Sequence, residues 1–303
     1  MGKRARRRIG RPASRTPTTL VFVGASLEDA LGSRLKKAFA EARCFPDLGG
    51  PEINGADLAL GIFKASDNHR PQAFAAWAHA AGVPALCVEL GENEALIGPL
   101  GLPGRAGCGR CASERMAAAF AAGLHPERVR ASRDVAGVAG PALVREVRAI
   151  IRRGPESSQL LDHILVVDAK TLDESLHRVV PLPRCTVCGG AAAFPQTSRE
   201  TVRLSPEDSP DVVLDALAGW VDGRTGVISG VFLEPPGDMA VGLPFIATAA
   251  PPHVMDEDGS LRRLPLGWGK GLTVSGAVLS AVGEAIERYA ASLPDSERII
   301  WER

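Results

Sequence analysis

Short apolar runs alternate with helix-forming stretches through the N-terminal third of the chain. The apolar runs predict buried strands at 19–24, 57–63 and 84–90. The stretches between them predict helices at 27–43 and 71–81, with Ser26 as the N-cap of the first. Because strand and helix alternate, we predict an α/β fold with a parallel sheet and crossover helices.

Further along the chain the pattern predicts a second unit. A stretch with little periodicity, 191–209, reads as a linker after a predicted strand at 163–167. The remaining elements are helices at 114–124, 141–153, 210–220 and 275–292, and strands at 227–233 and 244–250. We therefore divide the chain into a basic tail (1–16), a first domain (17–197) and a second domain (198–303).

The loop after the first predicted strand bears on nucleotide binding. Val23-Gly24-Ala25-Ser26 holds one glycine, whereas the dinucleotide-binding fingerprint needs three. We expect a degenerate Rossmann-like unit that lacks this fingerprint. The N-terminus of the helix that follows could still attract an anion.

Composition indicates a globular protein and sets limits on its partners. The 303 residues are 45% apolar and 23% charged with a formal net charge of zero, so no global field favours nucleic acid. No apolar run approaches the roughly 20 residues that span a bilayer. Residues 1–15 are strongly basic without the apolar stretch of a signal peptide. They predict a solvated tail or, alternatively, an arm for an acidic partner peptide or nucleic acid.

Four of the six cysteines form two Cys-x-x-Cys pairs, Cys108/Cys111 and Cys185/Cys188. Two thiolates at this spacing can bind one metal ion, and two such pairs make a tetrahedral four-thiolate zinc site. Glycines beside the cysteines let the backbone turn tightly enough to aim the sulfurs at one point. Since such a site has no open position for substrate, we predict a structural zinc that ties distant parts of one domain together.

Other interpretations of the cysteines stay open. Two disulfides would suit a secreted protein, and Cys-x-x-Cys also occurs as a redox motif. Nothing in the sequence indicates secretion, so we prefer zinc in a reducing cytoplasm. Cys44 and Cys87 lie in or beside apolar segments, which indicates buried structural thiols. With four thiolates available, we expect His177 to be packed or hydrogen-bonded and not a ligand.

The last predicted helix carries polar side chains on one face. At about 100° per residue, Ser280, Glu284, Glu287 and Arg288 fall within an arc of about 100°, opposite an apolar side. Two carboxylates one turn apart can hold a hard cation such as Mg²⁺ whose other ligands are phosphate oxygens. The pattern is also typical of a solvated amphipathic helix with an ordinary charged face, and from the helix alone we prefer this second interpretation.

The order of these motifs resembles a known family. Gly269-Lys270-Gly271, followed by the Ser-x-x-x-Glu-x-x-Glu-Arg pattern that begins at Ser280, looks like the opening ATP/Mg²⁺ motif of YcaO-type proteins. The segment from Gly98-Pro99 through both cysteine pairs resembles the ThiF-like zinc domain fused to them. That fusion is the cyclodehydratase of thiazole/oxazole-modified microcin biosynthesis.

The resemblance implies a fold and a chemistry. The fold is a ThiF-like α/β domain with structural zinc, followed by the N-terminal part of a YcaO-type α+β domain. Family members convert Cys, Ser or Thr of a ribosomally made precursor peptide into azolines, with ATP phosphorylating the amide oxygen. Glu284 and Glu287 would coordinate Mg²⁺ on ATP, Ser280 and Arg288 would support nucleotide binding, and Lys270 would approach a phosphate. No catalytic residue is assigned.

The resemblance also implies partners and leaves other functions open. The partners are the precursor peptide, a leader-peptide-binding protein, a dehydrogenase and a second copy in a homodimer; we expect neither nucleic acid nor membrane. The family's winged-helix peptide clamp and later acidic ATP-site motifs are missing, so we expect a truncated chain or half of a split enzyme. The alternatives are a non-catalytic zinc scaffold that presents the peptide to a separate YcaO-type enzyme, and a ThiF-like adenylating enzyme.

Overall fold

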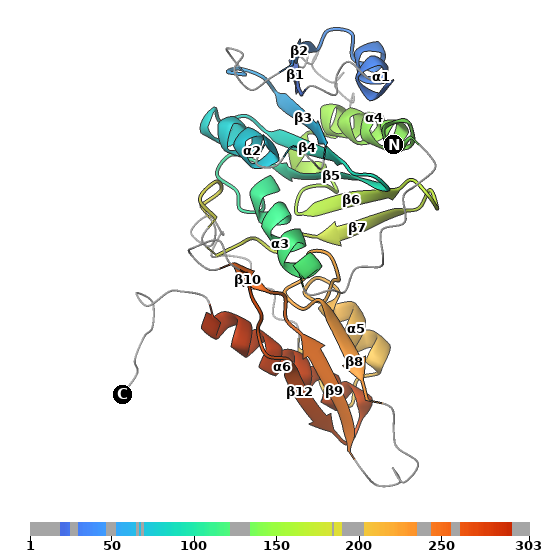
Figure 1. Cartoon of the computed structure of the whole chain (residues 1–303), viewed down its shortest axis with the longest axis vertical. Helices are drawn as coiled ribbons and strands as arrows, with labels where there is room; N and C mark the ends of the chain where they lie inside the picture. Colours follow the sequence, from blue (N-terminus) through green and yellow to red (C-terminus); the bar gives the residue numbers. More distant parts are fainter. Residues whose placement is uncertain are drawn as a thin grey trace, which may run out of the picture.

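A computed structural model of the chain describes residues 19–24, 30–46, 53–64, 67, 70–121, 134–183, 185–189, 203–234, 244–255 and 261–292. Within them, a seven-stranded sheet is followed in sequence by a three-stranded sheet, and a two-stranded ribbon pairs Val254–Met255 (β10) with Leu261–Arg262 (β11). Figure 1 shows the smaller sheet beyond the β7 side of the larger one. In the described part of the chain no helix is both long and apolar enough to cross a membrane.

The larger sheet is half parallel and half antiparallel. Its strand order is β2-β1-β3-β4-β5-β6-β7. The strands are β1 (Leu20–Val23), β2 (Arg43–Phe45), β3 (Leu58–Lys64), β4 (Ala85–Leu90), β5 (Glu94–Gly101), β6 (His163–Asp168) and β7 (Glu174–Arg178). The first four pair in parallel, as expected, whereas β4-β5, β5-β6 and β6-β7 are antiparallel. The predicted parallel pairing is therefore confirmed for β1, β3 and β4. The antiparallel pairs all involve β5 or β7, which were not predicted, and the short β4–β5 and β6–β7 connections cannot hold a crossover helix.

Helices cover both faces of this sheet (Figure 1). On β3, Leu58, Leu60 and Ile62 pack with α1 (Ala30–Ala38) and α4 (Val135–Arg153). The alternate side chains, Ala59 and Phe63, pack with α2 (Arg70–Ala80), and α3 (Gly109–Ala121) lies on the same face. Because both faces are covered, the central strands are apolar at consecutive positions, which is why they read as continuous apolar runs.

Several boundaries differ from the sequence prediction. Helix α4 begins at Val135 and not at Pro141, because the Asp134 carboxylate accepts hydrogen bonds from the amides of Ala136 and Gly137 and caps it there. Helix α3 begins before 114, α1 ends before 43, β5 contains the Gly98-Pro99 stretch expected as a loop, and β7 was not expected. The Ser26 cap, the 1–16 tail and most of the 191–209 linker lie outside the described residues.

The smaller sheet has the order β12-β9-β8, all antiparallel. Its strands are β8 (Gly230–Leu233), β9 (Phe245–Ala250) and β12 (Gly267–Gly271), and its helices are α5 (Pro210–Leu217) and α6 (Val274–Ser292). Ser209 caps α5 and Pro210 opens it, as predicted. The apolar side of α6, which includes Val278 and Val282, packs on Ala247 and Ala249 of β9.

Helix α6 lies directly on the backbone of β12. A Cβ added at Gly267 or Gly269 would stand 2.2 Å or 2.0 Å from a carbonyl oxygen of α6, and one at Gly271 would stand 2.4 Å from an amide nitrogen. These distances leave no room for any side chain, so the three alternating glycines are what allow strand and helix to approach.

Polar contacts join the two sheets. Arg224, in the loop before β8, makes a bidentate ion pair with Glu94 of β5, with N–O distances of 2.9 and 2.8 Å. His177 Nδ1 of β7 lies 2.8 Å from Asp222 Oδ2. The expectation that His177 is hydrogen-bonded is therefore confirmed, and its partner is an interface carboxylate.

Replacing Gly269 by Ala will destabilise the smaller sheet. The new Cβ would collide with the Ala277 carbonyl of α6, and such overpacking destabilises by about 1–3 kcal/mol. Gly283→Ala is the matched control, because a Cβ there meets nothing within 4 Å and removes a helix glycine, stabilising by up to about 1 kcal/mol. Urea unfolding measures both. Equal midpoints for the two variants would contradict this account of the β12–α6 contact.

Asp222→Asn will weaken the polar contact between the two sheets and lower the free energy of unfolding. Burial raises the pKa of Asp222, but hydrogen bonds from His177 and from the amides of Arg224 and Thr225 lower it below its usual value overall. The stabilisation is therefore present above about pH 4 and is lost as pH falls through the depressed folded-state pKa. We expect the variant to lose about 1–3 kcal/mol at neutral pH, a gap that shrinks below pH 4 in urea titrations. Exposed Asp215→Asn is the control, and an equal loss in both variants would contradict the assignment.

Candidate functional site

The four cysteines of the two Cys-x-x-Cys pairs come together in the structure. Cys108 and Cys111 lie at the N-terminal end of α3, and Cys185 and Cys188 lie in the loop after β7. All four are buried, and their sulfur atoms lie within 4.8 Å of one another. The cluster sits in a small apolar core that also holds Ala106, Ala112, Ile164, Val166 and Val179.

Sulfur spacing separates a metal site from disulfides. The Cys108–Cys185 and Cys111–Cys188 sulfur distances are 3.5 and 3.7 Å, and all four cysteines are free. A disulfide needs about 2.05 Å, whereas sulfurs bound at about 2.3 Å around one tetrahedral ion lie about 3.8 Å apart. Each close contact also joins the two motifs and not the two cysteines of one motif. The arrangement could therefore hold one metal ion.

Local backbone geometry aims the sulfurs inward. Gly107 and Gly189, which flank the pairs, have φ of 101° and 75°, in the region that favours glycine. The amide of Gly189 donates to the carbonyl of Cys185 at 3.0 Å, which closes the second turn. The amide of Leu182 lies 3.4 Å from Cys111 Sγ, and such donors stabilise a thiolate.

Crowding of the thiols changes their acidity in opposite directions. Hydrogen bonds from Cys108 and Cys111 lower the pKa of Cys185 to about 7. Hydrogen bonding to Cys111 and the other thiols raises the pKa of Cys108. Without a metal, ionisation of one thiol in the cluster makes ionisation of its neighbours less favourable. A bound metal ion would supply the positive charge that lets all four thiols ionise.

Two arginines of α3 support the cluster, and the sequence analysis missed both. Arg110, between the first two cysteines, pairs with Glu114 at 2.6 Å and donates to Thr186 in the second pair. Arg115 is only 3% exposed and donates to the carbonyls of Val180 and Pro181 at 3.0 and 3.5 Å. An arginine one turn beyond the motif on the same helix was the available signal.

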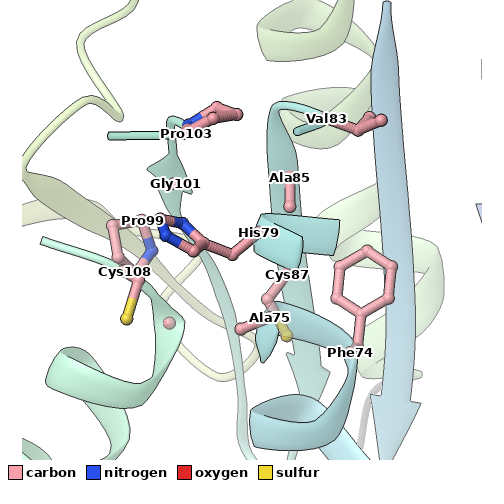
Figure 2. A pocket seen from close by; sticks show the side chains of 11 residues that line it. Phe74, Ala75, His79, Val83, Ala85, Cys87, Pro99, Gly101, Pro103 and Cys108 are labelled. Carbon is pink, nitrogen blue, oxygen red and sulfur yellow. The ribbon is translucent and has the colours of Figure 1, made fainter. Parts of the chain in front are cut away.

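A small cavity lies beside the cluster (Figure 2). Its volume is about 10 Å³, enough for about one water molecule and too small for a substrate. Cys108 and Pro99 lie on one side of it and Cys87 and Phe74 on the other. Burial raises the pKa of Cys87 well above its ordinary value, which makes it an unreactive structural thiol, as expected. Cys44 is half-buried.

The polar face of α6 is partly engaged with β12. Glu284 accepts a hydrogen bond from the amide of Trp268 at 2.6 Å and pairs with Arg288, and Arg288 also donates to the carbonyl of Leu266. Because β12 is an edge strand, these contacts satisfy backbone groups that no neighbouring strand reaches. Ser280 and Glu287 are exposed, and neither has a polar contact among the described residues.

The structure separates Lys270 from the helix residues. Gly269 and Gly271 face α6, so Lys270 between them projects from the opposite face of the strand. Lys270 is exposed there, as is Trp268 two residues earlier. The predicted grouping of Lys270 with the polar residues of α6 is not seen.

Gly24 has a packing role that needs no nucleotide. Its φ is 139°, and a Cβ there would stand 2.0 Å from the carbonyl oxygen of Ile62 on β3. The amide of Gly24 donates to the carbonyl of Phe45 on β2. Close approach of three strands therefore explains this glycine.

Comparisons with known proteins show likeness of structure. A heterocyclase in complex with substrate and cofactor matches 91% of this chain and 40% of its own, at 17% identity and a TM-score of 0.58. The heterocyclase TruD matches 70% of this chain and 33% of its own, at 19% identity and a TM-score of 0.49. Escherichia coli MccB with ATP matches 57% of this chain, at 16% identity and a TM-score of 0.40.

The first of these matches shows likeness of fold alone, and the chain spans about 40% of the length of that heterocyclase. No protein-family model and no curated protein matches the sequence.

Cys185→Ser will abolish metal binding and weaken the fold. The intact chain should carry about one thiophilic metal ion, and loss of one buried thiolate should leave well below half of that by elemental analysis. A chelator should lower the melting temperature of the intact chain but not of the variant. Cys44→Ser, outside the cluster, should keep its metal. Equal metal contents in the two variants would contradict a four-thiolate site.

Proposed function

We propose that this chain is part of an ATP-dependent enzyme that converts Cys, Ser or Thr of a ribosomally made precursor peptide into azolines. In that reaction the side-chain thiol or hydroxyl attacks the preceding amide carbon, and phosphorylation by ATP makes the amide oxygen a leaving group. An amide oxygen is otherwise a very poor leaving group, so activation lowers a high barrier.

One observation carries the proposal. A single structural match to a heterocyclase runs through 91% of the chain, and so takes in both the four-cysteine cluster and the α6 unit. Residues before 190 form the larger sheet and residues after 202 form the smaller one, which supports a scaffold domain at 17–197 and a second domain at 198–303. That neighbour was solved with substrate and cofactor, which supports a substrate and a cofactor as partners here.

We assign the metal of the cysteine cluster as zinc with a structural role. Four thiolates suit zinc, and a four-coordinate site leaves no position for a reacting group. Cys108, Cys111, Cys185 and Cys188 would hold the ion, and the free thiols support a reducing, cytoplasmic setting.

Helix α6 would contribute to an ATP/Mg²⁺ site. Exposed Glu287 offers the oxygen ligand that Mg²⁺ prefers, and Ser280 lies on the same face of the helix. Glu284 would add a second carboxylate only by giving up its hydrogen bond to the amide of Trp268. Arg288 would reach phosphate oxygens while keeping Glu284 in place. Lys270 would act from the other face of β12.

A second candidate is a non-catalytic zinc scaffold that presents the peptide to a separate enzyme. The engagement of Glu284 and Arg288 with the β12 edge favours it, because both residues then have a complete structural role. On this view Glu287 is an ordinary exposed side chain.

Glu287→Gln distinguishes the two candidates. The chain is combined with the polypeptide that supplies the rest of a heterocyclase, candidate precursor peptides, ATP and Mg²⁺, and mass spectrometry counts one water lost per ring. If the chain is catalytic, Glu287→Gln should slow the reaction at least about tenfold with an unchanged melting temperature. If the chain is a scaffold, the variant should react at the normal rate.

Two further variants serve as controls. Exposed Glu41→Gln, between α1 and β2 of the larger sheet, should leave the rate unchanged. Glu284→Gln should lower the melting temperature because the contact with β12 weakens. If a combination that binds ATP leaves every candidate peptide unchanged in mass, the azoline proposal is wrong.

A further inference from the structure

A basic groove lies between helices α1 and α4, on the face of the larger sheet opposite the cysteine cluster. Its volume is about 610 Å³. We call it the α1–α4 groove. It is lined by Arg34, Lys37 and Ala38 from α1 and by Pro141, Val144, Arg145, Arg148 and Arg152 from α4. Nothing in the proposed reaction uses these side chains.

Within the described part of the chain, three cations of the groove have no carboxylate partner. The Arg145 guanidinium pairs with Glu146 and Glu174, and the charge of this one arginine is therefore neutralised. Among the described residues, no carboxylate pairs with Arg34, Lys37 or Arg148, and all three are exposed. Like charges gathered without a counter-charge raise the local potential and attract anions.

Two of the cations are held in position. The stem of Arg34 crosses Gly140 of α4, where an added Cβ would meet Arg34 Cδ at 2.8 Å. The Arg148 guanidinium lies 6.0 Å from the ring centre of Phe39, at the C-terminal end of α1. Fixed cations lose less freedom on binding than mobile ones, so the groove is partly preorganised for a ligand.

The spacing and the lining suit a peptide. On α4, Arg145, Arg148 and Arg152 follow at steps of three and four, which places them along one face over about 10 Å. Ala38, Pro141 and Val144 add apolar surface between the charged side chains. A ligand with carboxylates at helical spacing and an apolar stripe between them would match both features.

We infer that the α1–α4 groove docks an acidic segment of a partner polypeptide. The lining offers no exposed aromatic ring on which nucleic-acid bases could stack. The apolar surface of Ala38, Pro141 and Val144 favours a peptide over a nucleic acid. The inference is independent of the proposed reaction, because binding needs neither ATP nor turnover.

Fluorescence anisotropy with the full chain tests this inference. The probe is a labelled peptide of about four helical turns with Glu and Leu at helical spacing. Its counterparts are the same peptide with Lys for Glu and a single-stranded oligonucleotide. We expect the Glu peptide to bind at low salt, to bind more weakly as salt is raised, and to bind more tightly than either counterpart. Failure of the Glu peptide to bind, or tighter binding of the oligonucleotide, overturns the inference.

Charge-reversal variants test whether the Glu peptide binds in the α1–α4 groove. Lys37→Glu with Arg148→Glu should weaken binding of the Glu peptide at least about tenfold, whereas exposed Lys170→Glu, at the start of the β6–β7 turn, should not. Both changes in the groove are at exposed positions, and unchanged metal content and melting temperature would verify the fold. The basic segment 1–15 would also attract the peptide, so a photo-crosslinking peptide is mapped by mass spectrometry. Crosslinks to α1 or α4 support the groove; crosslinks confined to residues 1–15, with normal binding by the double variant, overturn it.

Discussion

Four buried cysteines whose sulfur atoms lie within 4.8 Å of one another could hold a metal ion. As thiolates they would need such a cation to balance their negative charge. The surrounding core is small, with alanines at Ala106 and Ala112, so apolar burial alone contributes modestly there. A bound metal would fix the start of α3 against the loop after β7. That loop supplies the carbonyls that hold Arg115, and Arg115 in turn lies 5.2 Å from the ring centre of Tyr289 on α6. Through Arg115 and Tyr289 the cluster is therefore linked to α6, although α6 contributes no cysteine to it.

Two ion pairs contribute to the joint between the two sheets, beside the apolar contact of Val180 with Val227, Leu264 and Tyr289. Arg224 with Glu94, and Asp222 with His177, bring together strands and loops far apart in sequence. These pairs are half-shielded from water, so each is stronger than a surface ion pair. Removal of one partner, however, leaves the other charge half-buried without a counter-charge. Polar joints of this kind set orientation more than they add stability. His177, which by residue type could bind a metal, is thus explained by how the sheets meet.

Sequence patterns predicted the elements whose cause is local. The strands β1, β3 and β4, helix α2 and the Ser209-Pro210 start of α5 follow from apolar runs and capping residues, and the convergence of the cysteines follows from their paired spacing. The patterns failed where tertiary contacts decide. Pro141 looks like a helix start, but the cap at Asp134 lies earlier. Strand β7 is mostly exposed and carries no apolar run. Gly269 and Gly271, which flank Lys270 in the motif that resembles an ATP site, have a packing role that the sequence does not show: with Gly267, their spacing matches the backbone of α6 packed against β12.

The same residues that suggest a phosphate site also complete an edge strand, and this bears on what α6 can do. An edge strand leaves every second amide and carbonyl without a partner; Glu284 and Arg288 supply one acceptor and one donor at that edge. A carboxylate that already accepts two hydrogen bonds is a weaker ligand for Mg²⁺ unless the metal replaces one of them. Glu287 accepts no such hydrogen bond among the described residues, since it is exposed and lies about one turn from the contacts with β12. Any Mg²⁺ bound at this helix would therefore depend first on Glu287, with further oxygens from phosphate, water and other polypeptide segments, and would engage Glu284 only if β12 gave up its contact at Trp268.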